Sequence, residues 1–402
     1  MNTITVANSR PLDPLDETAS LGATANRALA PDILRALAIL LVMLLHLPAE
    51  ATPLPLVGIR PYGWLGVDIF FVLSGFLIGT QLMTEAARRD SVDFKSFYLR
   101  RALRILPAFF AVLAVYTFIP SLRDTPTMQS GWRFLTSTLN FGLDPRSGGA
   151  FTEAWSLSAA AHFYLVLPVL VLLLKRRATI VSVAVLAATI VIAGMGLRFT
   201  IWQSQVGVPA EAYEYSQAFA AYIRDVYYPT YNRLDGVVFG VVLAAVRLFR
   251  PLLWERYMPP YIALVIGSMF ATAALMIFSG RGPFAETNLP LMLQPLPGAV
   301  VGFPLFSAGV ALLLGALLDL QPKIGRWHLP AVTGIATLSY SLYLTHKGVY
   351  NLDRMVFGRE NLQGLSGFVI YFATCFIVAV ALWFLVEKSF LHLRDHLVPR
   401  SH

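Results

Sequence analysis

Long apolar segments, separated by short polar or basic stretches, follow one another from residue 31 almost to the end of the chain. A helix that crosses the hydrocarbon core of a bilayer needs about 20 mostly apolar residues. A segment in lipid must also satisfy its backbone hydrogen bonds internally, which favours helices. The pattern therefore predicts an all-α polytopic membrane protein with about ten transmembrane helices, near residues 33–48, 64–83, 101–120, 155–174, 178–201, 232–249, 258–279, 296–318, 332–350 and 365–389.

The two ends of the chain are more polar than the middle. Residues 1–30 contain Pro11 and Pro14 and have no apolar stretch of the signal-peptide kind, so we predict a flexible cytoplasmic tail and no cleavable leader. Residues 31–390 form the predicted transmembrane domain, and residues 391–402 form a short cytoplasmic tail. The last letters, LVPRSH, resemble the remnant of a protease-cleavable linker, so an engineered chain is one alternative.

Composition supports the membrane assignment and changes how the charge is interpreted. Hydrophobic residues make up 56% of the chain and charged residues 13%, which excludes an ordinary soluble enzyme. A net charge of +8 would suggest nucleic acid as a partner of a soluble protein, but here the basic residues collect in alternate loops. That distribution predicts both termini on the cytoplasmic side of a bilayer, and no nucleic-acid partner. The inner basic set is Arg88, Arg89, Lys95, Arg100, Arg101, Arg104, Lys175, Arg176, Arg177, Arg247, Arg250, Arg256, Lys323 and Arg326.

Two ionisable residues lie eleven positions apart in the first apolar segment, Arg35 and His46. An ionisable group inside a membrane helix costs free energy, so such residues usually mark a reaction or transport path. At a rise of 1.5 Å per residue they lie about 16 Å apart along the helix, Arg35 near the cytoplasmic face and His46 near the outer face. We expect other polar side chains at the outer level: Asp68, Trp155, Ser156, Arg198, Arg233, Asp235 and His346.

Three arginines lead into the third predicted helix on the inner side. Arg100 and Arg104 fall on one helix face, with Arg101 within the same turn. Guanidinium groups bind phosphates through paired donors, so the cluster suits a phosphorylated ligand. The alternative is ordinary positive charge that anchors the inner side of the helix.

Five sequence blocks together resemble the membrane acyltransferase-3 family, the bacterial multi-pass O-acyltransferases. They occur in the family's order and cover nearly the whole chain. The blocks are R-x10-H at 35–46, GWLGVDIFFVLSGFLI at 63–78, FYLRRALRILP at 97–107, EAWSLS with HFYLVLP at 153–168, and LSYSLYLTH at 338–346.

The resemblance implies an acyltransferase for groups other than amino-acyl groups. It implies transfer of an acyl group, commonly acetyl from acetyl-CoA, to a hydroxyl of a carbohydrate or another acceptor at the outer face of the bacterial inner membrane. His46 matches the family's essential histidine and Arg35 its partner, and Arg100, Arg101 and Arg104 match the arginine motif associated with the acyl-CoA donor. We predict that His46 is the general base. Direct transfer and a route through an acyl-histidine both remain open.

Further residues receive tentative roles as acceptor contacts or supports. In the alternative interpretation, Arg233 and Asp235 form an ion pair that stabilises the fold. Asp68 then caps a helix or forms an ion pair of its own. The glycines at 63–78 most simply allow close helix packing, and Trp64, Tyr227 and Tyr228 are predicted anchors at the membrane interface. Trp155, Ser156 and Tyr340 are candidate oxyanion donors. The tentative set is Asp68, Trp155, Ser156, Arg233, Asp235, Tyr340 and His346.

One departure from the family keeps a second interpretation open. Ala160 and Ala161 stand where the family usually has glutamates, so the chain could use Glu153 or Asp68 instead, or could bind the donor without turnover. A transporter, the third interpretation, predicts an inverted repeat, and the two halves share no such similarity. No zinc-type His/Cys set, Walker loop or dinucleotide motif occurs, so we expect no metal and no cofactor beyond the donor. We expect the loops at 121–154 and 201–231 to determine which acceptor binds. We expect the single cysteine, Cys375, to be a packing residue.

Overall fold

The structure is a computed structural model that describes residues 28–89, 91–144, 149–174, 179–211, 214–280, 293–327 and 329–398. Within these ranges the regular structure is helical, apart from one isolated bridge between Met128 and Ala150. The predicted all-α class is therefore confirmed. Most of the predicted N-terminal tail, the basic run at 175–177 and most of the LVPRSH ending lie outside the described residues.

Each of the ten predicted segments contains a long helix. The apolar runs set the positions of these helices, because each run must be covered by lipid or by another helix. The helices are α2 (Leu29–His46), α4 (Leu65–Arg89), α5 (Phe94–Phe118), α7 (Trp155–Leu174), α8 (Ile180–Ile201), α11 (Asp235–Phe249), α13 (Pro260–Phe278), α14 (Phe303–Asp319), α16 (Pro330–Phe357) and α17 (Gly364–Leu382).

By length and composition, 8 helices of the described chain are able to cross a membrane. A ninth results if α11 and α12 (Pro251–Tyr257), which meet at a bend of 106°, form one broken span. The helix α16 is long enough but carries His346, Lys347, Asp353 and Arg354, which lower its hydropathy. The protein is thus a polytopic membrane protein, and the number of spans and the side of each terminus stay predictions.

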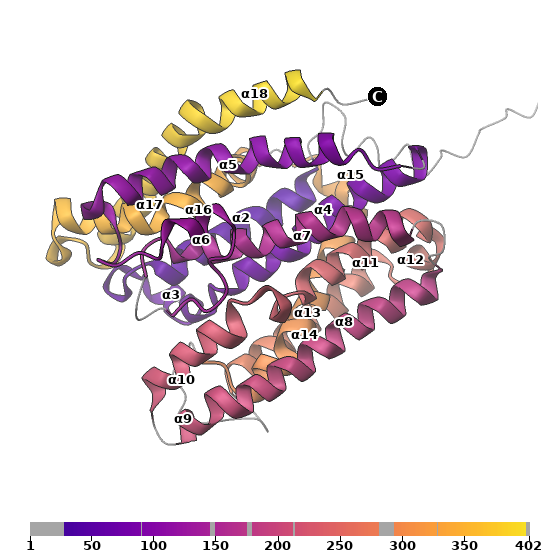
Figure 1. Ribbon diagram of the computed structural model, residues 1–402, viewed down its shortest axis with the longest axis horizontal. Helices are drawn as coiled ribbons and strands as arrows, with labels where there is room; N and C mark the ends of the chain where they lie inside the picture. The colour runs from indigo at the N-terminus through magenta and orange to yellow at the C-terminus, as the bar shows by residue number, and fades with distance from the viewer. Residues whose placement is uncertain are drawn as a thin grey trace, which may run out of the picture.

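The helices run along the long axis of the molecule, with short elements gathered at its two ends (Figure 1). At one end, where α2 finishes at His46, lie α3 (Leu54–Val57), α6 (Gly131–Leu135), α9 (Val208–Glu211) and α10 (Tyr215–Ala221). At the other end, where α2 begins, lie α12 and α15 (Gln321–Ile324). We call these the His46 end and the Arg35 end.

Glycines bring the central helices into backbone contact. A Cβ atom added to Gly66 at the start of α4 would lie 2.3 Å from the carbonyl oxygen of Ala38 in α2. A Cβ atom at Gly75 would lie 2.2 Å from the carbonyl oxygen of Val237 in α11. No side chain fits at such positions, and small residues are what allow membrane helices to approach this closely. The predicted packing role of the glycines at 63–78 is confirmed.

The outer helices complete the bundle around α2, α4 and α11. Figure 1 shows α5 and α8 on opposite sides, with α18 (Lys388–Leu397) lying along α5. The chain passes from α17 to α18 through the helical turn η11 (Trp383–Glu387), so helix continues beyond residue 390, where the C-terminal tail was predicted to begin. On α8, Val181, Val185 and Ile192 are exposed, and exposed apolar side chains of this kind fit a lipid-facing surface.

Candidate active site

Two cavities lie inside the bundle and meet at two side chains. The large cavity, of about 610 Å³, is enclosed mainly by α4, α5, α7 and α16. The small cavity, of about 130 Å³, lies nearer the His46 end. Val67 and Tyr343 line both cavities, so these two side chains form the border between them.

The large cavity has a basic region and otherwise mostly apolar walls. Arg101 and Arg104 line it, together with Arg35, whereas Arg100 does not. The Arg101 guanidinium donates a hydrogen bond to Gln81 Oε1 at 2.7 Å and lies 5.8 Å from the ring centre of Tyr164. The structure therefore brings two of the three predicted donor-binding arginines to one cavity.

Arg35 and His46 face different cavities. Arg35 lines the large cavity and forms an ion pair with Asp32, at 3.2 Å between Nη1 and Oδ1. His46 lines the small cavity. The two predicted catalytic residues thus stay apart, and α2 carries one of them to each cavity.

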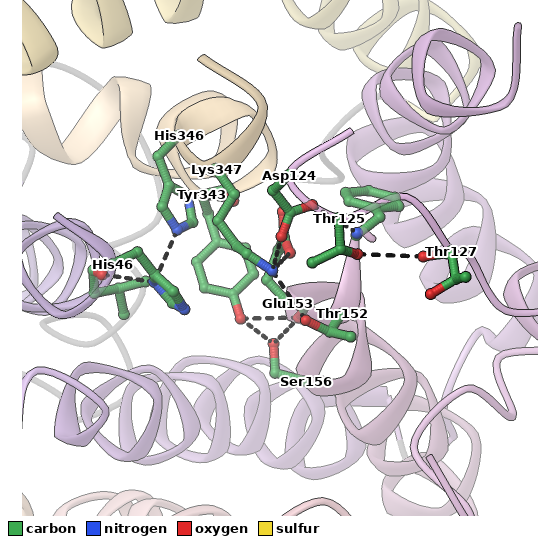
Figure 2. A network of polar contacts seen from close by, with 12 residues as sticks. His46, Asp124, Thr125, Thr127, Thr152, Glu153, Ser156, Tyr343, His346 and Lys347 are labelled. Atoms are coloured by element: carbon green, nitrogen blue, oxygen red, sulfur yellow. Dashed lines mark hydrogen bonds and ion pairs between the residues drawn. The ribbon is translucent and has the colours of Figure 1, made fainter. Parts of the chain in front are cut away.

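His46 contacts a second histidine, His346 of α16 (Figure 2). The distance between His46 Nδ1 and His346 Nε2 is 3.1 Å, and His46 Nδ1 lies 3.0 Å from the carbonyl oxygen of Val42. His346 Nδ1 lies 2.9 Å and 3.1 Å from the carbonyl oxygens of Tyr343 and Leu342. His346 is fully buried, whereas His46 is half-buried.

These contacts assign the tautomers of both neutral rings. A carbonyl oxygen only accepts, so the Nδ1 atoms of His346 and His46 each carry a proton. His346 Nε2 then shares the single His46 Nδ1–H with the Val42 carbonyl oxygen, as a second acceptor. His46 Nε2 is left with a free lone pair, which is the state that a general base requires.

Hydroxyl groups join α7 to α16 at the border between the cavities. Tyr343 Oη donates to the carbonyl oxygen of Glu153 at 3.0 Å, and Ser156 Oγ lies 2.7 Å from Tyr343 Oη (Figure 2). Ser156 also lines the large cavity. Tyr343 was not singled out in the sequence, although it lies three residues before His346 and so on the same helix face.

A half-buried lysine of α16 contacts two other segments of the chain beside the small cavity. Lys347 Nζ lies 2.6 Å from Asp124 Oδ2, 3.2 Å from Glu153 Oε2 and 3.0 Å from Thr152 Oγ1 (Figure 2). Glu153, in the turn η4 (Thr152–Ala154) just before α7, also lines the small cavity. Burial raises the pKa of the Glu153 carboxyl above its ordinary value, although the Lys347 ammonium opposes that shift.

Aromatic side chains form most of the wall of the small cavity. Trp64, Tyr227 and Tyr228 are all buried, so their predicted role as membrane-interface anchors is wrong. Tyr227 packs under the guanidinium of Arg233, at 4.4 Å from the ring centre, and this contact holds it in the core. The aromatic lining consists of Trp64, Trp155, Phe219, Tyr222, Tyr227, Tyr228 and Tyr343.

Three residues of the tentative set form buried ion pairs. Arg233 Nη2 lies 2.8 Å from both carboxylate oxygens of Asp68, and Arg198 Nη1 lies 2.7 Å from Asp235 Oδ2. Neither pair lines either cavity. The geometry fits the structural alternative, with the difference that Arg233 pairs with Asp68 rather than with Asp235.

The remaining singled-out residues border the large cavity. Tyr340 lines it and donates to the carbonyl oxygen of Ile105 at 2.8 Å. Ala160 and Ala161 line it as well, so the family's glutamates are missing from the wall of this cavity.

Cys375 is buried, in agreement with its predicted packing role. Among the described residues, no group of three or more His, Cys, Asp or Glu side chains could hold a metal ion.

Comparison with known families identifies the domain. A family model for an acyltransferase domain matches residues 29–386, which includes both cavities. The chain belongs to the membrane acyltransferase-3 family. The predicted family is confirmed, and the acyltransferase-3 domain covers nearly the whole described structure.

Curated relatives carry the same domain within longer proteins. The peptidoglycan O-acetyltransferase OatA of Listeria monocytogenes is 27% identical over 344 residues, 81% of this chain and 50% of that protein. A putative O-acetyltransferase of Staphylococcus aureus is 27% identical over 340 residues, 79% of this chain and 50% of that protein. The acyltransferase-3 chain thus spans about half the length of these relatives. No solved structure matches it significantly.

Proposed function

We propose that this protein transfers an acetyl group from acetyl-CoA to a hydroxyl of a carbohydrate acceptor, with His46 as the general base. The observation that carries the proposal is the pair of adjoining cavities. One is basic and the other contains a histidine whose Nε2 is free to take a proton. A donor and an acceptor could enter separately and meet at the border formed by Val67 and Tyr343.

The large cavity suits an acyl-CoA donor. Its volume falls within the range of about 300 to 1,000 Å³ that is usual for small-molecule sites. Arg101 and Arg104 offer charged donors for phosphates, and the apolar walls suit the uncharged arm that carries the thioester. The thioester would then approach His46 from the Arg35 end.

In the proposed direct route, the acceptor hydroxyl gives its proton to His46 Nε2 while its oxygen attacks the thioester carbonyl carbon. The C–O bond forms, the C–S bond breaks, and the proton on His46 moves to the departing CoA sulfur. His346 keeps the His46 ring in the orientation that exposes Nε2. In the other route, His46 itself takes the acetyl group before passing it to the acceptor hydroxyl.

The acceptor class follows from the relatives and is part of the proposal. The Listeria monocytogenes relative is a peptidoglycan O-acetyltransferase, so glycan hydroxyls are the acceptors that we propose. The predicted topology places the donor on the cytoplasmic side and the acceptor on the outer side of a bacterial inner membrane.

The deciding experiment measures transfer of radiolabelled acetyl from acetyl-CoA to peptidoglycan glycan fragments by the purified protein in proteoliposomes. We expect His46→Ala to lose about 100-fold or more of the transfer rate, because it removes the general base. His392→Ala, at an exposed position of α18, is the matched control and should transfer normally. Full transfer by His46→Ala would contradict the proposal.

A non-catalytic relative is the second candidate, favoured by the missing acids at Ala160 and Ala161 in the large cavity. It predicts that the unsubstituted protein binds acetyl-CoA without forming product. Recovery of transfer by Ala160→Glu alone would identify a disabled enzyme.

A further inference from the structure

We propose that the small cavity is the acceptor subsite and that the Glu153 carboxylate there accepts a hydrogen bond from a sugar hydroxyl. The inference rests on the proposed function and extends it to a binding residue and an acceptor geometry. Four features of the described residues support it: the unused hydrogen-bonding capacity of Glu153, the position of His46, the aromatic walls and the size of the cavity.

The Glu153 carboxylate has hydrogen-bonding capacity that the protein leaves unused. Glu153 is 4% exposed, and the Lys347 ammonium, 3.2 Å from Oε2, is the side-chain partner of its carboxyl group among the described residues. A carboxylate can accept about four hydrogen bonds. Buried polar groups in folded proteins usually have their hydrogen-bonding capacity filled, and a bound ligand is one way to fill it.

The Glu153 carboxylate and the general base share one cavity. Glu153 and His46 both line the small cavity, which Tyr343 separates from the large cavity. A hydroxyl bound to Glu153 would hold its sugar so that a neighbouring hydroxyl reaches His46. Positioning of this kind accelerates a two-substrate reaction, because it replaces a random encounter by a fixed geometry.

The walls of the cavity favour a sugar over a strongly charged acceptor. Trp155 and Tyr228 both line the cavity and pack against each other with ring centres 4.9 Å apart, and such side chains combine an apolar ring with a polar N–H or O–H group. Sugars likewise combine apolar C–H faces with hydroxyls. The Lys347 ammonium is shared between the Glu153 and Asp124 carboxyl groups, so its charge does not attract an anionic acceptor.

The size of the cavity limits how much of the acceptor it can take. Its volume of about 130 Å³ lies below the range of about 300 to 1,000 Å³ that is usual for a site that holds a whole small-molecule ligand. The cavity therefore suits a part of a glycan acceptor. The rest of a glycan would stay outside, at the His46 end.

The test compares initial rates of acetyl transfer to the N-acetylglucosamine–N-acetylmuramic acid disaccharide, varied at fixed acetyl-CoA, for the full protein in proteoliposomes. We expect Glu153→Gln to raise the acceptor KM at least tenfold and to change the acetyl-CoA KM less than twofold. A neutral amide accepts a weaker hydrogen bond than a carboxylate does. Glu153→Asp keeps the negative charge beside Lys347, but its side chain is one methylene group shorter, so the carboxylate oxygens lie farther from the acceptor. This variant should raise the acceptor KM as well.

Asp124→Asn is the matched control. It also removes one carboxylate from Lys347, but Asp124 does not line the small cavity. An equal rise of the acceptor KM in Asp124→Asn and Glu153→Gln would overturn the inference, because the effect would then act through Lys347. An unchanged acceptor KM in both Glu153 variants, with normal transfer, would overturn the inference alone. No transfer by the unsubstituted protein would overturn the proposed function and this inference with it.

Discussion

His346 and the carbonyl oxygen of Val42 together orient the His46 ring. The Nδ1–H of His346 is committed to backbone carbonyls, so its Nε2 is the atom that accepts a hydrogen bond from His46 Nδ1–H. A ring held in this way presents one nitrogen to the acceptor, whereas a free imidazole exchanges between two tautomers. His346 is therefore a positioning residue in the proposed reaction.

Replacing His346 should lower kcat and leave both KM values nearly unchanged. We expect His346→Leu to reduce kcat by about 10- to 100-fold, because the His46 ring loses its fixed orientation but not its proton-accepting nitrogen. His346→Gln supplies a side-chain oxygen as acceptor and should restore part of the rate. Steady-state kinetics with both substrates would measure this, and a rise in KM without a fall in kcat would contradict the positioning role.

The sequence predicted some site residues and could not predict others. His46, Arg101 and Arg104 stand in the sequence blocks that resemble the acyltransferase-3 family, and that resemblance selected them. Glu153 and Lys347 come together only because the turn η4 packs against α16, although the two residues are 194 positions apart in the chain. No local sequence pattern reports such a contact. Trp64 was misplaced because an aromatic residue at a helix end has the same pattern whether it faces lipid or the core.

At the scale of elements, the apolar runs determine where helices form, and glycines determine which helices meet. The sequence therefore predicted all ten long helices. It did not predict the 106° bend between α11 and α12, or the continuation of α17 into α18. Both features depend on how a helix end packs against neighbouring elements, and periodicity within one segment carries no information on that.

Gly75→Ala should destabilise the contact between α4 and α11. The added methyl group would lie 2.2 Å from the carbonyl oxygen of Val237, so the two helices must separate. Overpacking of this kind costs about 1 to 3 kcal/mol of unfolding free energy. We expect a lower unfolding temperature of the detergent-solubilised protein.

The control for this substitution is Gly196→Ala in α8, where the new methyl group meets no atom within 4 Å. Alanine is the better helix former, so this variant should keep or slightly raise the unfolding temperature. Equal unfolding temperatures for both variants would show that the glycine contact does not contribute to stability.

For the whole molecule, the predicted topology assigns the two ends of the bundle to opposite sides of the membrane. The basic residues Lys323 and Arg326 lie beside the Arg35 end, where Ala30 N donates to Gln321 Oε1 at 3.1 Å. The short elements at the His46 end carry the aromatic cavity and the loops around it. The Arg35 end should therefore face the cytoplasm.

Cysteine labelling in intact cells would test this orientation. We expect a cysteine at Ser130, exposed at the His46 end, to react with a membrane-impermeant maleimide added outside. A cysteine at Arg326, exposed at the Arg35 end, should react only after the membrane is permeabilised. The native Cys375 is buried and should give little background. The reverse pattern would show that the predicted topology is inverted.

The helix α2 runs without interruption from Leu29 to His46, so the separation between its arginine and its histidine is fixed by the covalent chain. One residue inserted between them would turn His46 by about 100° around the helix axis relative to Arg35. Substitutions in the loops at the His46 end leave this spacing and this angle untouched. Evolution could therefore exchange one acceptor for another by altering those loops, while the spacing between the proposed donor site and the proposed base is inherited unchanged.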